Sequence, residues 1–110
     1  MRNPPPLRNR REFQRVLTAG RRARRDGILA AALPGPDPKA SLRLGLAVHC
    51  HGAVARNWAK RRLRAAFREL ELRPGFDVVV RADERVLRAG YENLVGDLSA
   101  ALTEATEGRR

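Results

Sequence analysis

Apolar residues follow two different spacings along the chain, and these spacings predict six elements of secondary structure. In residues 10–19, 53–70 and 90–106 the apolar positions recur every three or four residues, which predicts three helices. Residues 27–33, 42–48 and 76–82 are short aliphatic runs, which predicts strands. The resulting order, α-β-β-(β)-α-β-α, leaves open whether the first run is split into two strands. We therefore predict an α+β fold, a two-layer sandwich with the helices packed on one mixed sheet.

Capping and turn residues mark where these elements begin and end. Asn9 is a suitable N-cap for the first helix, with Glu12 three residues later as its partner, and Gly20 is a suitable stop. Residues 20–26, GRRARRD, are predicted to form a basic turn, and residues 34–41, PGPDPKAS, a loop.

The chain is short enough to form one domain. With 110 residues it matches the usual size of a single compact unit. The three prolines at positions 4–6 predict a flexible, extended arm over residues 1–8. One folded domain is expected over residues 9–106, followed by a disordered tail over 107–110. No apolar run approaches the roughly 20 residues of a membrane span, so no membrane partner is expected. One cysteine and no apolar leader indicate a cytoplasmic protein.

The net charge of the chain points to a polyanionic partner. There are 23 Lys and Arg residues against 12 acidic ones, for a net charge of +11. Residues 1–73 hold 18 of the cations and five acids, so the excess lies in the first two-thirds. Nearly all of the cations are arginines, which pair with phosphate through two parallel hydrogen bonds, and this favours nucleic acid.

The charge is most concentrated in the predicted helix of residues 53–70, AVARNWAKRRLRAAFREL. At 100° per residue, Ala55, Ala59, Leu63, Ala66, Phe67 and Leu70 share one face, and Asn57, Lys60, Arg61, Arg64 and Arg68 form a stripe on the opposite face, with Arg56 and Arg62 at its margins. Ordinary solvated faces mix the two signs of charge, whereas this stripe collects one sign despite the repulsion. We therefore interpret the stripe as a phosphate-binding surface.

This helix resembles the Arg-Asn-Arg helix of the protein subunit of bacterial ribonuclease P. The flanking segments resemble the same family in the same order: Arg11-Glu12-Phe13 with Val16, Leu44-Gly45-Leu46, Pro74-Gly75-Phe76-Asp77-Val78-Val79 and Tyr91-Glu92. The resemblance implies a subunit that binds a catalytic RNA and the 5′ leader of precursor tRNA, in a holoenzyme that matures the 5′ end of tRNA. It also implies that the RNA carries out the cleavage and holds the Mg²⁺ ions, that no catalytic residue or tightly bound metal belongs to this chain, and that no protein partner is obligatory.

The resemblance also implies which residues contact RNA. On the basic helix these are Arg56, Asn57, Lys60, Arg61, Arg62, Arg64 and Arg68. A leader cleft between the first helix and the sheet would be lined by Phe13, Leu17 and Val48. A secondary RNA patch would comprise Arg10, Arg11, Arg21, Arg22, Arg24, Arg25, His49 and His51. The family fold contains a left-handed βαβ crossover, whereas chain physics favours a right-handed one.

The chain departs from the family pattern at three places. Trp58 stands at the third position of Arg-Asn-Arg, where it either packs on neighbouring aliphatic side chains or stacks on a base or an arginine. His49-Cys50-His51 replaces a longer Lys-rich segment, and too few ligands are present for a zinc site. Alanines 30–32 stand on the facing strand where the family often has aromatic residues, which weakens the case for base stacking across the cleft. Phe13 itself is either the core anchor of the first helix or a ring that lines the leader cleft.

Other functions fit the sequence less well. A ribosomal or other structural RNA-binding protein would also be small and rich in arginine, but it would more often carry a long basic tail. An independent nuclease would need a cluster of acidic residues or histidines, which the chain does not show. A helix-turn-helix DNA reader would need a second helix just before the basic one.

Overall fold

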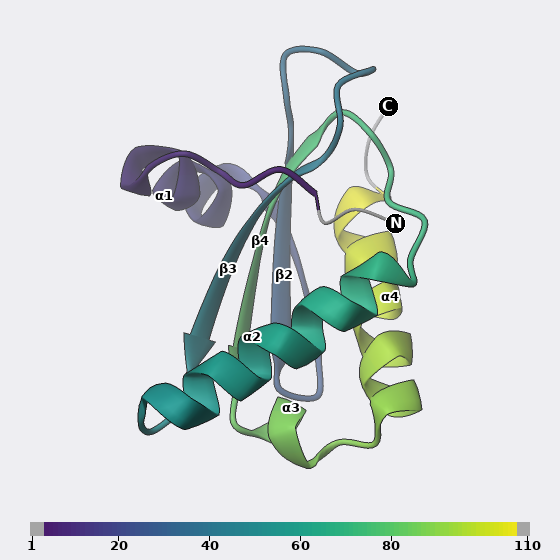
Figure 1. Ribbon diagram of the computed structural model, residues 1–110. Coiled ribbons are helices and arrows are strands. Elements are labelled where there is room, and N and C mark those ends of the chain that lie inside the picture. The colour runs from purple at the N-terminus through teal and green to yellow at the C-terminus, as the bar shows by residue number, and fades with distance from the viewer. Residues whose placement is uncertain (1–3, 108–110) are drawn as a thin grey trace.

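The computed structural model describes residues 4–107 and contains four helices and four strands in that range (Figure 1). They follow the order α1 (Arg10–Ala19), β1 (Arg21–Arg25), β2 (Ile28–Pro34), β3 (Arg43–His49), α2 (Ala53–Arg68), β4 (Phe76–Asp83), α3 (Arg85–Arg88) and α4 (Tyr91–Thr106). The α+β class and the three long helices are confirmed. The short helix α3 was not predicted. Residues 1–3 and 108–110, which include most of the predicted tail, lie outside the described part of the chain.

The four strands form one mixed sheet in the order β1-β2-β4-β3. β1 and β2 are antiparallel, β2 and β4 are antiparallel, and β3 and β4 are parallel. The prediction of a basic turn over residues 20–26 is wrong, because Arg21–Arg25 is the edge strand β1. The tight turn lies instead at Asp26 and Gly27, where Gly27 has a φ of +80°. Asp-Gly between two strands is a common hairpin signal, and it was available in the sequence.

The parallel strands β3 and β4 are joined by α2, and this crossover is left-handed. In Figure 1, β3 runs downward, α2 passes in front of the sheet and rises to the right, and β4 returns beside β3 on its right. Chain physics makes nearly all such connections right-handed, so the hand expected from general principles is wrong here. The hand implied by the family resemblance is the one observed.

The helices cover the two faces of the sheet unequally. The main core lies between α2, α4 and one sheet face, around the buried side chains of Leu63, Phe67, Val80 and Leu98. α1 packs on the opposite face, where Val16 contacts a small second core with Ala31 and Val79. The predicted two layers are therefore supplemented by a third, partial layer formed by α1 alone, which leaves part of that sheet face open.

The segment before α1 lies along the outer edge of β3. The backbone N–H of Leu44 donates to the carbonyl of Pro5 at 2.8 Å, and the N–H of Leu7 donates to the carbonyl of Leu44 at 3.2 Å. Proline has no N–H to offer, so this strand-like pairing remains short. The part of the predicted arm that the structure describes is thus held against the sheet and covers an otherwise open edge.

Local contacts define the two ends of α1. The Oδ1 of Asn9 accepts from the N–H of Glu12 at 3.0 Å, as predicted for an N-cap, but the Glu12 carboxylate accepts from the N–H of Arg8 rather than from that of Asn9. Gly20 ends the helix with an ordinary φ of −77°. A Cβ at this position would lie 2.5 Å from the carbonyl oxygen of Val16 and 2.9 Å from that of Ala32. Gly20 is therefore required by close backbone approach rather than by a left-handed conformation.

Candidate nucleic-acid interface

One face of α2 anchors the helix to the core. Ala59, Leu63, Ala66 and Phe67 are fully buried, and Ala55 and Leu70 are partly buried, as the spacing of apolar residues predicted. Burying Leu63 and Phe67 contributes roughly 1.5–3 kcal/mol for each side chain by transfer alone. The opposite face of the helix is thereby held in a fixed orientation toward solvent.

The opposite face of α2 carries a polar stripe, which we call the α2 stripe and define as Asn57 and the four cations Lys60, Arg61, Arg64 and Arg68. Arg61, Arg64 and Arg68 are exposed and Lys60 is partly exposed. Within residues 4–107 none of these four cations forms an ion pair or a protein hydrogen bond, and the first turn of α2 carries no acidic residue. The nearest acid along the chain, Glu69, accepts a hydrogen bond from the Tyr91 hydroxyl at 2.5 Å. The stripe is thus available to a polyanion.

The two arginines at the margins of the stripe differ from it. The guanidinium of Arg62 donates through Nη1 to the carbonyl of Leu87 at 3.0 Å and through Nη2 to the carbonyl of Ala89 at 2.8 Å. These bonds cap the end of α3 and fix it to α2. Arg56 makes only a long contact, 3.5 Å, to the carbonyl of Cys50. Among the residues of this helix that were predicted to contact RNA, Arg62 is therefore already engaged in hydrogen bonds within the protein.

Trp58 lies on the surface of α2 and is 56% exposed. Neighbouring side chains cover less than half of the indole, which belongs to neither hydrophobic core, and Val54, one turn before it, is itself 73% exposed. A shallow hollow of about 390 Å³ lies beside these two side chains and is lined also by Asn57, Lys60, Arg61 and Arg64. The indole is thus accessible next to the stripe.

The second candidate surface is the sheet face on which α1 packs. Phe13 is half-buried, and its ring lies so close to β3 that a Cβ on Gly45 would be 2.7 Å from the ring. Leu17 packs on the same small core. Both predicted side chains therefore lie between α1 and the sheet, where Phe13 serves as an anchor and still presents part of its ring to solvent.

The third predicted cleft residue, Val48, lies on the other face. Val48 is paired with Ala82 in register and packs against the main core with α2 and α4. Because successive side chains of a strand alternate between its faces, Ala47 and His49 point to the side of α1. Val48 therefore does not lie between α1 and the sheet as predicted, and at this end of β3 the residue that points to the side of α1 is His49.

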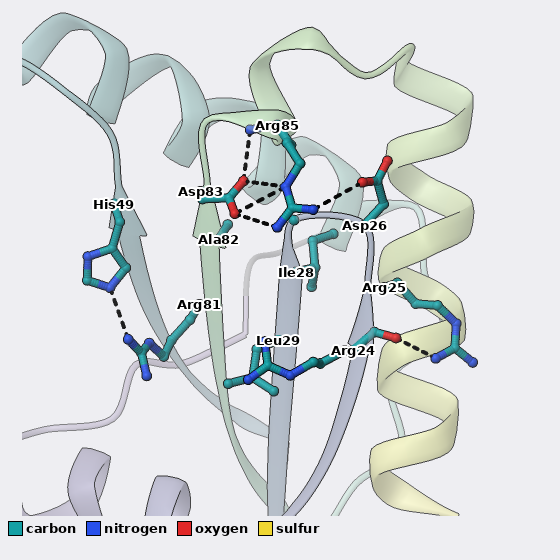
Figure 2. A pocket seen from close by; sticks show the side chains of 11 residues that line it. Arg24, Arg25, Asp26, Ile28, Leu29, His49, Arg81, Ala82, Asp83 and Arg85 are labelled. Atoms are coloured by element: carbon teal, nitrogen blue, oxygen red, sulfur yellow. Dashed lines mark hydrogen bonds and ion pairs between the residues drawn. The ribbon is translucent and has the colours of Figure 1, made fainter.

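Beyond α1 the sheet face opens into a hollow of about 350 Å³ near the β1–β2 hairpin (Figure 2). Arg24, Leu29, His49 and Arg81 line it, and the Nε2 of His49 lies 3.4 Å from the Nη2 of Arg81. In the described part of the chain the guanidinium of Arg24 has no hydrogen-bond partner. This surface combines cations with an aliphatic floor, which suits a single-stranded nucleic acid.

An ion pair closes one rim of this hollow. Arg85 donates from Nη2 to the Oδ2 of Asp83 at 2.8 Å, and its Nη1 lies 3.6 Å from the Oδ1 of Asp26 (Figure 2). The hydrogen bonds from Arg85 lower the pKa of the Asp83 carboxyl. Two carboxylates and one guanidinium leave this rim with one net negative charge, and among the described residues the unpaired positive charge of the hollow resides on Arg24 and Arg81.

The predicted secondary patch does not form one surface. In β1, Arg22 and Arg24 point to the face of α1, whereas Arg21 and Arg25 point to α4. Arg22 donates to the carbonyl of Leu17 at 2.7 Å and caps α1. Contacts to Glu104 engage the other pair: Arg21 donates to its carbonyl at 3.0 Å, and Arg25 pairs with its carboxylate at 2.8 Å. Arg10, Arg11 and His51 are exposed elsewhere.

A network of charged side chains ties α1 to the sheet. No pattern in the sequence indicated it. Arg43 on β3 donates to both carboxylate oxygens of Asp77 on β4 at 2.9 Å, and its Nη2 lies 3.1 Å from the Oε2 of Glu12. The N–H of Arg8 and then the contact with Arg43 lower the pKa of the Glu12 carboxyl. Arg43 and Asp77 are 34 positions apart and meet only because β3 and β4 pair in parallel, so the sequence alone could not predict this contact.

Potential metal ligands do not gather in the structure. Among residues 4–107 no three His, Cys, Asp or Glu side chains lie close enough together to hold a metal ion. Cys50 packs against the main core, and burial raises its pKa. No helix in this range combines the length and the apolar character needed to span a membrane.

Comparisons with known proteins agree with this architecture. The family model described as Ribonuclease P matches residues 1–106. The ribonuclease P protein component of Picosynechococcus sp. is 30% identical over 104 residues, covering 90% of this chain and 88% of the relative. That of Streptomyces griseus is 36% identical over 115 residues, covering 93% and 92%.

Solved structures share the fold. The ribonuclease P protein of Thermotoga maritima superposes with a TM-score of 0.74 at 25% identity, covering 88% of this chain and 94% of that one. The protein from Staphylococcus aureus gives a TM-score of 0.74 at 21% identity, covering 88% and 91%. The chain therefore belongs to the family of ribonuclease P protein components, the protein subunits of an endoribonuclease that acts in tRNA processing.

Proposed function

We propose that the α2 stripe docks on the catalytic RNA of ribonuclease P and that the open sheet face beside α1 receives the 5′ leader of precursor tRNA. Together these contacts would promote maturation of the 5′ end of tRNA, in the cytoplasm. The observation that carries the proposal is the stripe itself, four cations on one rigid helix face with no acidic partner in the described structure.

The α2 stripe is suited to a folded RNA. Lys60, Arg61, Arg64 and Arg68 repeat at three- and four-residue spacing, so they form a continuous row along about two turns of helix. Bringing like charges together costs a few tenths of a kcal/mol for each pair in the free protein. Binding of RNA phosphates would remove this repulsion and release the counterions that surround the phosphates, and both effects favour the complex.

The open face beside α1 is suited to an unpaired strand. Arg24 and Arg81 supply charge for the backbone, and the exposed part of Phe13 supplies an aromatic surface for a base. The strand residues beneath them, Ala31 and Leu29 on β2, are small or aliphatic and buried, so they form only the floor of this surface. In place of Val48, His49 would contribute the contact from β3, because its side chain points to this face.

Cleavage of the phosphodiester bond is assigned to the RNA. The holoenzyme is expected to use Mg²⁺ held mainly by RNA, and the donor set of this chain does not fit such an ion, because its acidic groups near the hollow, Asp26 and Asp83, are engaged by Arg85. The protein's own residues bind, orient and neutralise phosphates where RNA strands come together.

The test is reconstitution with a bacterial ribonuclease P RNA. Purified protein is added at a low magnesium concentration at which the RNA alone is slow, and cleavage of a precursor tRNA is measured. We expect stimulation with the RNA present and no cleavage by RNA-free protein. Binding without stimulation would favour a structural RNA-binding protein instead, and cleavage by repurified, ribonuclease-treated protein would refute the assignment of chemistry to RNA.

A further inference from the structure

Trp58 creates an apolar site inside an otherwise cationic surface. Its indole is 56% exposed and Val54, one turn earlier, is 73% exposed, and these are the two most exposed large hydrophobic residues among residues 4–107. We call the two side chains the Trp58 patch. The hollow beside them is lined by the patch and by Asn57, Lys60, Arg61 and Arg64.

Nothing inside the described structure accounts for this indole. It does not belong to either of the two hydrophobic cores. It is not covered by a cation either, because the arginine–aromatic stack found within residues 4–107 is that of Arg73 over Phe76, at 5.8 Å from the ring centroid. Leaving so large an aromatic surface in water is unfavourable, since tryptophan can bury 150–250 Å². The patch is thus free to bind a partner.

The surroundings of the patch identify the chemistry of that partner. The side chains around the hollow suit three kinds of group. An anion would pair with Lys60, Arg61 and Arg64, a flat apolar group would stack on the indole, and a hydrogen-bonding group would bind the Asn57 amide, which can both donate and accept. A nucleotide carries all three features in one unit: a phosphate, a flat base and the hydrogen-bonding edge of that base. An acidic protein segment would satisfy the cations but not the accessible ring.

We propose that Trp58 is a stacking platform for an unpaired base of the RNA that docks on α2. The inference rests on the proposed function and adds to it a contact of a different kind. In the Arg-Asn-Arg pattern that this helix resembles, an arginine stands at the position of Trp58. This chain therefore replaces one charge–phosphate contact with a base stack, and the stack contributes affinity that does not depend on counterion release.

The chain offers a direct probe, because Trp58 is its single tryptophan. The protein is titrated with a bacterial ribonuclease P RNA while indole fluorescence is recorded, and binding is followed in parallel by filter retention. Stacking on a base should quench the fluorescence along the same curve as binding. Binding with unchanged emission would overturn the proposal. A blue shift that grows with protein concentration in the absence of RNA would overturn it in favour of contact between two copies of the chain.

Three substitutions separate stacking from charge. Trp58→Ala should weaken RNA binding roughly 5- to 20-fold, the lower part of the range for loss of one base–aromatic stack, without changing the slope of log affinity against log salt concentration. Trp58→Phe should retain most of the affinity. Trp58→Arg should recover part of it with a steeper slope, by roughly 0.7 to 0.9. Equal affinity of Trp58→Ala and the unmodified protein would overturn the proposal.

Thermal melting provides the folding control. Because the indole is exposed, all three variants should melt within a few degrees of the parent protein. A failure of this proposal is distinguishable from a failure of the proposed function. If the unmodified protein stimulates cleavage but Trp58→Ala binds and stimulates equally well, only the stacking role is wrong. If the unmodified protein does not bind or stimulate the RNA at all, the proposed function itself is wrong.

Discussion

Replacing Arg61 and Arg64 by alanine should weaken RNA binding while leaving the protein folded. Both side chains are exposed on the α2 stripe, and in the described structure neither forms a hydrogen bond or an ion pair. Arg61 lies three residues from Arg64, and Arg64 lies four residues from both Lys60 and Arg68, so the double variant also relieves repulsion along the helix. We expect the free energy of unfolding to change by less than about 0.5 kcal/mol.

The expected loss of affinity follows from counterion release. Each phosphate contact contributes roughly 0.7 to 0.9 to the slope of log affinity against log salt, so removing two should reduce the slope by about 1.4 to 1.8. At 0.15 M salt the same relation gives a loss of roughly 15- to 30-fold. The complete stripe with its flanking contacts is expected to give a total slope of roughly −3 to −5.

The assay is filter retention of labelled ribonuclease P RNA at four or more salt concentrations, with thermal melting of each variant. Two matched controls lie in the same chain. Lys39→Ala removes a charge from the loop between β2 and β3 and should leave the slope unchanged. Arg62→Ala removes a charge from α2 itself but also breaks the bonds to the carbonyls of Leu87 and Ala89, so it should destabilise the fold by about 1–3 kcal/mol.

Two results would refute this reasoning. An unchanged salt slope in the Arg61/Arg64 variant would mean that the stripe is only a solvated face. A large drop in its melting temperature would mean that these arginines support the fold, contrary to their exposure. If Arg62→Ala melted like the parent protein, the assignment of Arg62 as the cap of α3 would be wrong.

Three further predictions follow from contacts elsewhere. Arg43→Ala should destabilise the fold by about 1–3 kcal/mol in denaturant titrations, because it leaves the buried Asp77 without its bidentate partner; an unchanged midpoint would contradict this. The hydrogen bond to Glu69 raises the pKa of Tyr91, so the stabilisation it supplies should be present below about pH 10 and lost as pH rises through the raised pKa, a loss absent from Tyr91→Phe; the absorbance of this single tyrosine reports the titration. Phe13→Leu should still assemble with the RNA but lose preference for precursor over mature tRNA, and an unchanged ratio of affinities would exclude Phe13 from the leader site.

Local signals in the sequence were sufficient to predict the three long helices. The repeat of apolar residues in α2 and α4 identified their buried faces, because a helix places residues three and four apart on one side whatever it packs against. The Asn9 cap of α1 was also readable, since its contact spans only three residues. By contrast β1 was missed, because an edge strand with four arginines among its five residues has almost no apolar pattern, and the Asp26-Gly27 turn was its one local sign.

The orientation of individual cations required the tertiary structure. The arginines of β1 divide between two faces because a strand alternates, and a predicted turn has no such alternation. Arg62 is engaged within the protein and Arg61 is not, because α3 brings the carbonyls of Leu87 and Ala89 within reach of Arg62. Sequence alone could count these charges and place them on a helix or a loop, but it could not distinguish a guanidinium that caps a helix from one that remains available to RNA.

The sequence alone determined the order of the three long helices and of strands β2, β3 and β4, the buried and cationic faces of α2, and the polyanionic partner. These features depend on residue type and on spacing within a few positions. Only the tertiary structure decided the left-handed crossover, the third layer formed by α1 and the pairing of Arg43 with Asp77. It also decided that His49, and not Val48, points to the side of α1. Each of these depends on which strands become neighbours and in what register. Strand pairing joins residues tens of positions apart, and a shift of one residue exchanges the two faces of a strand, so local pattern cannot determine it.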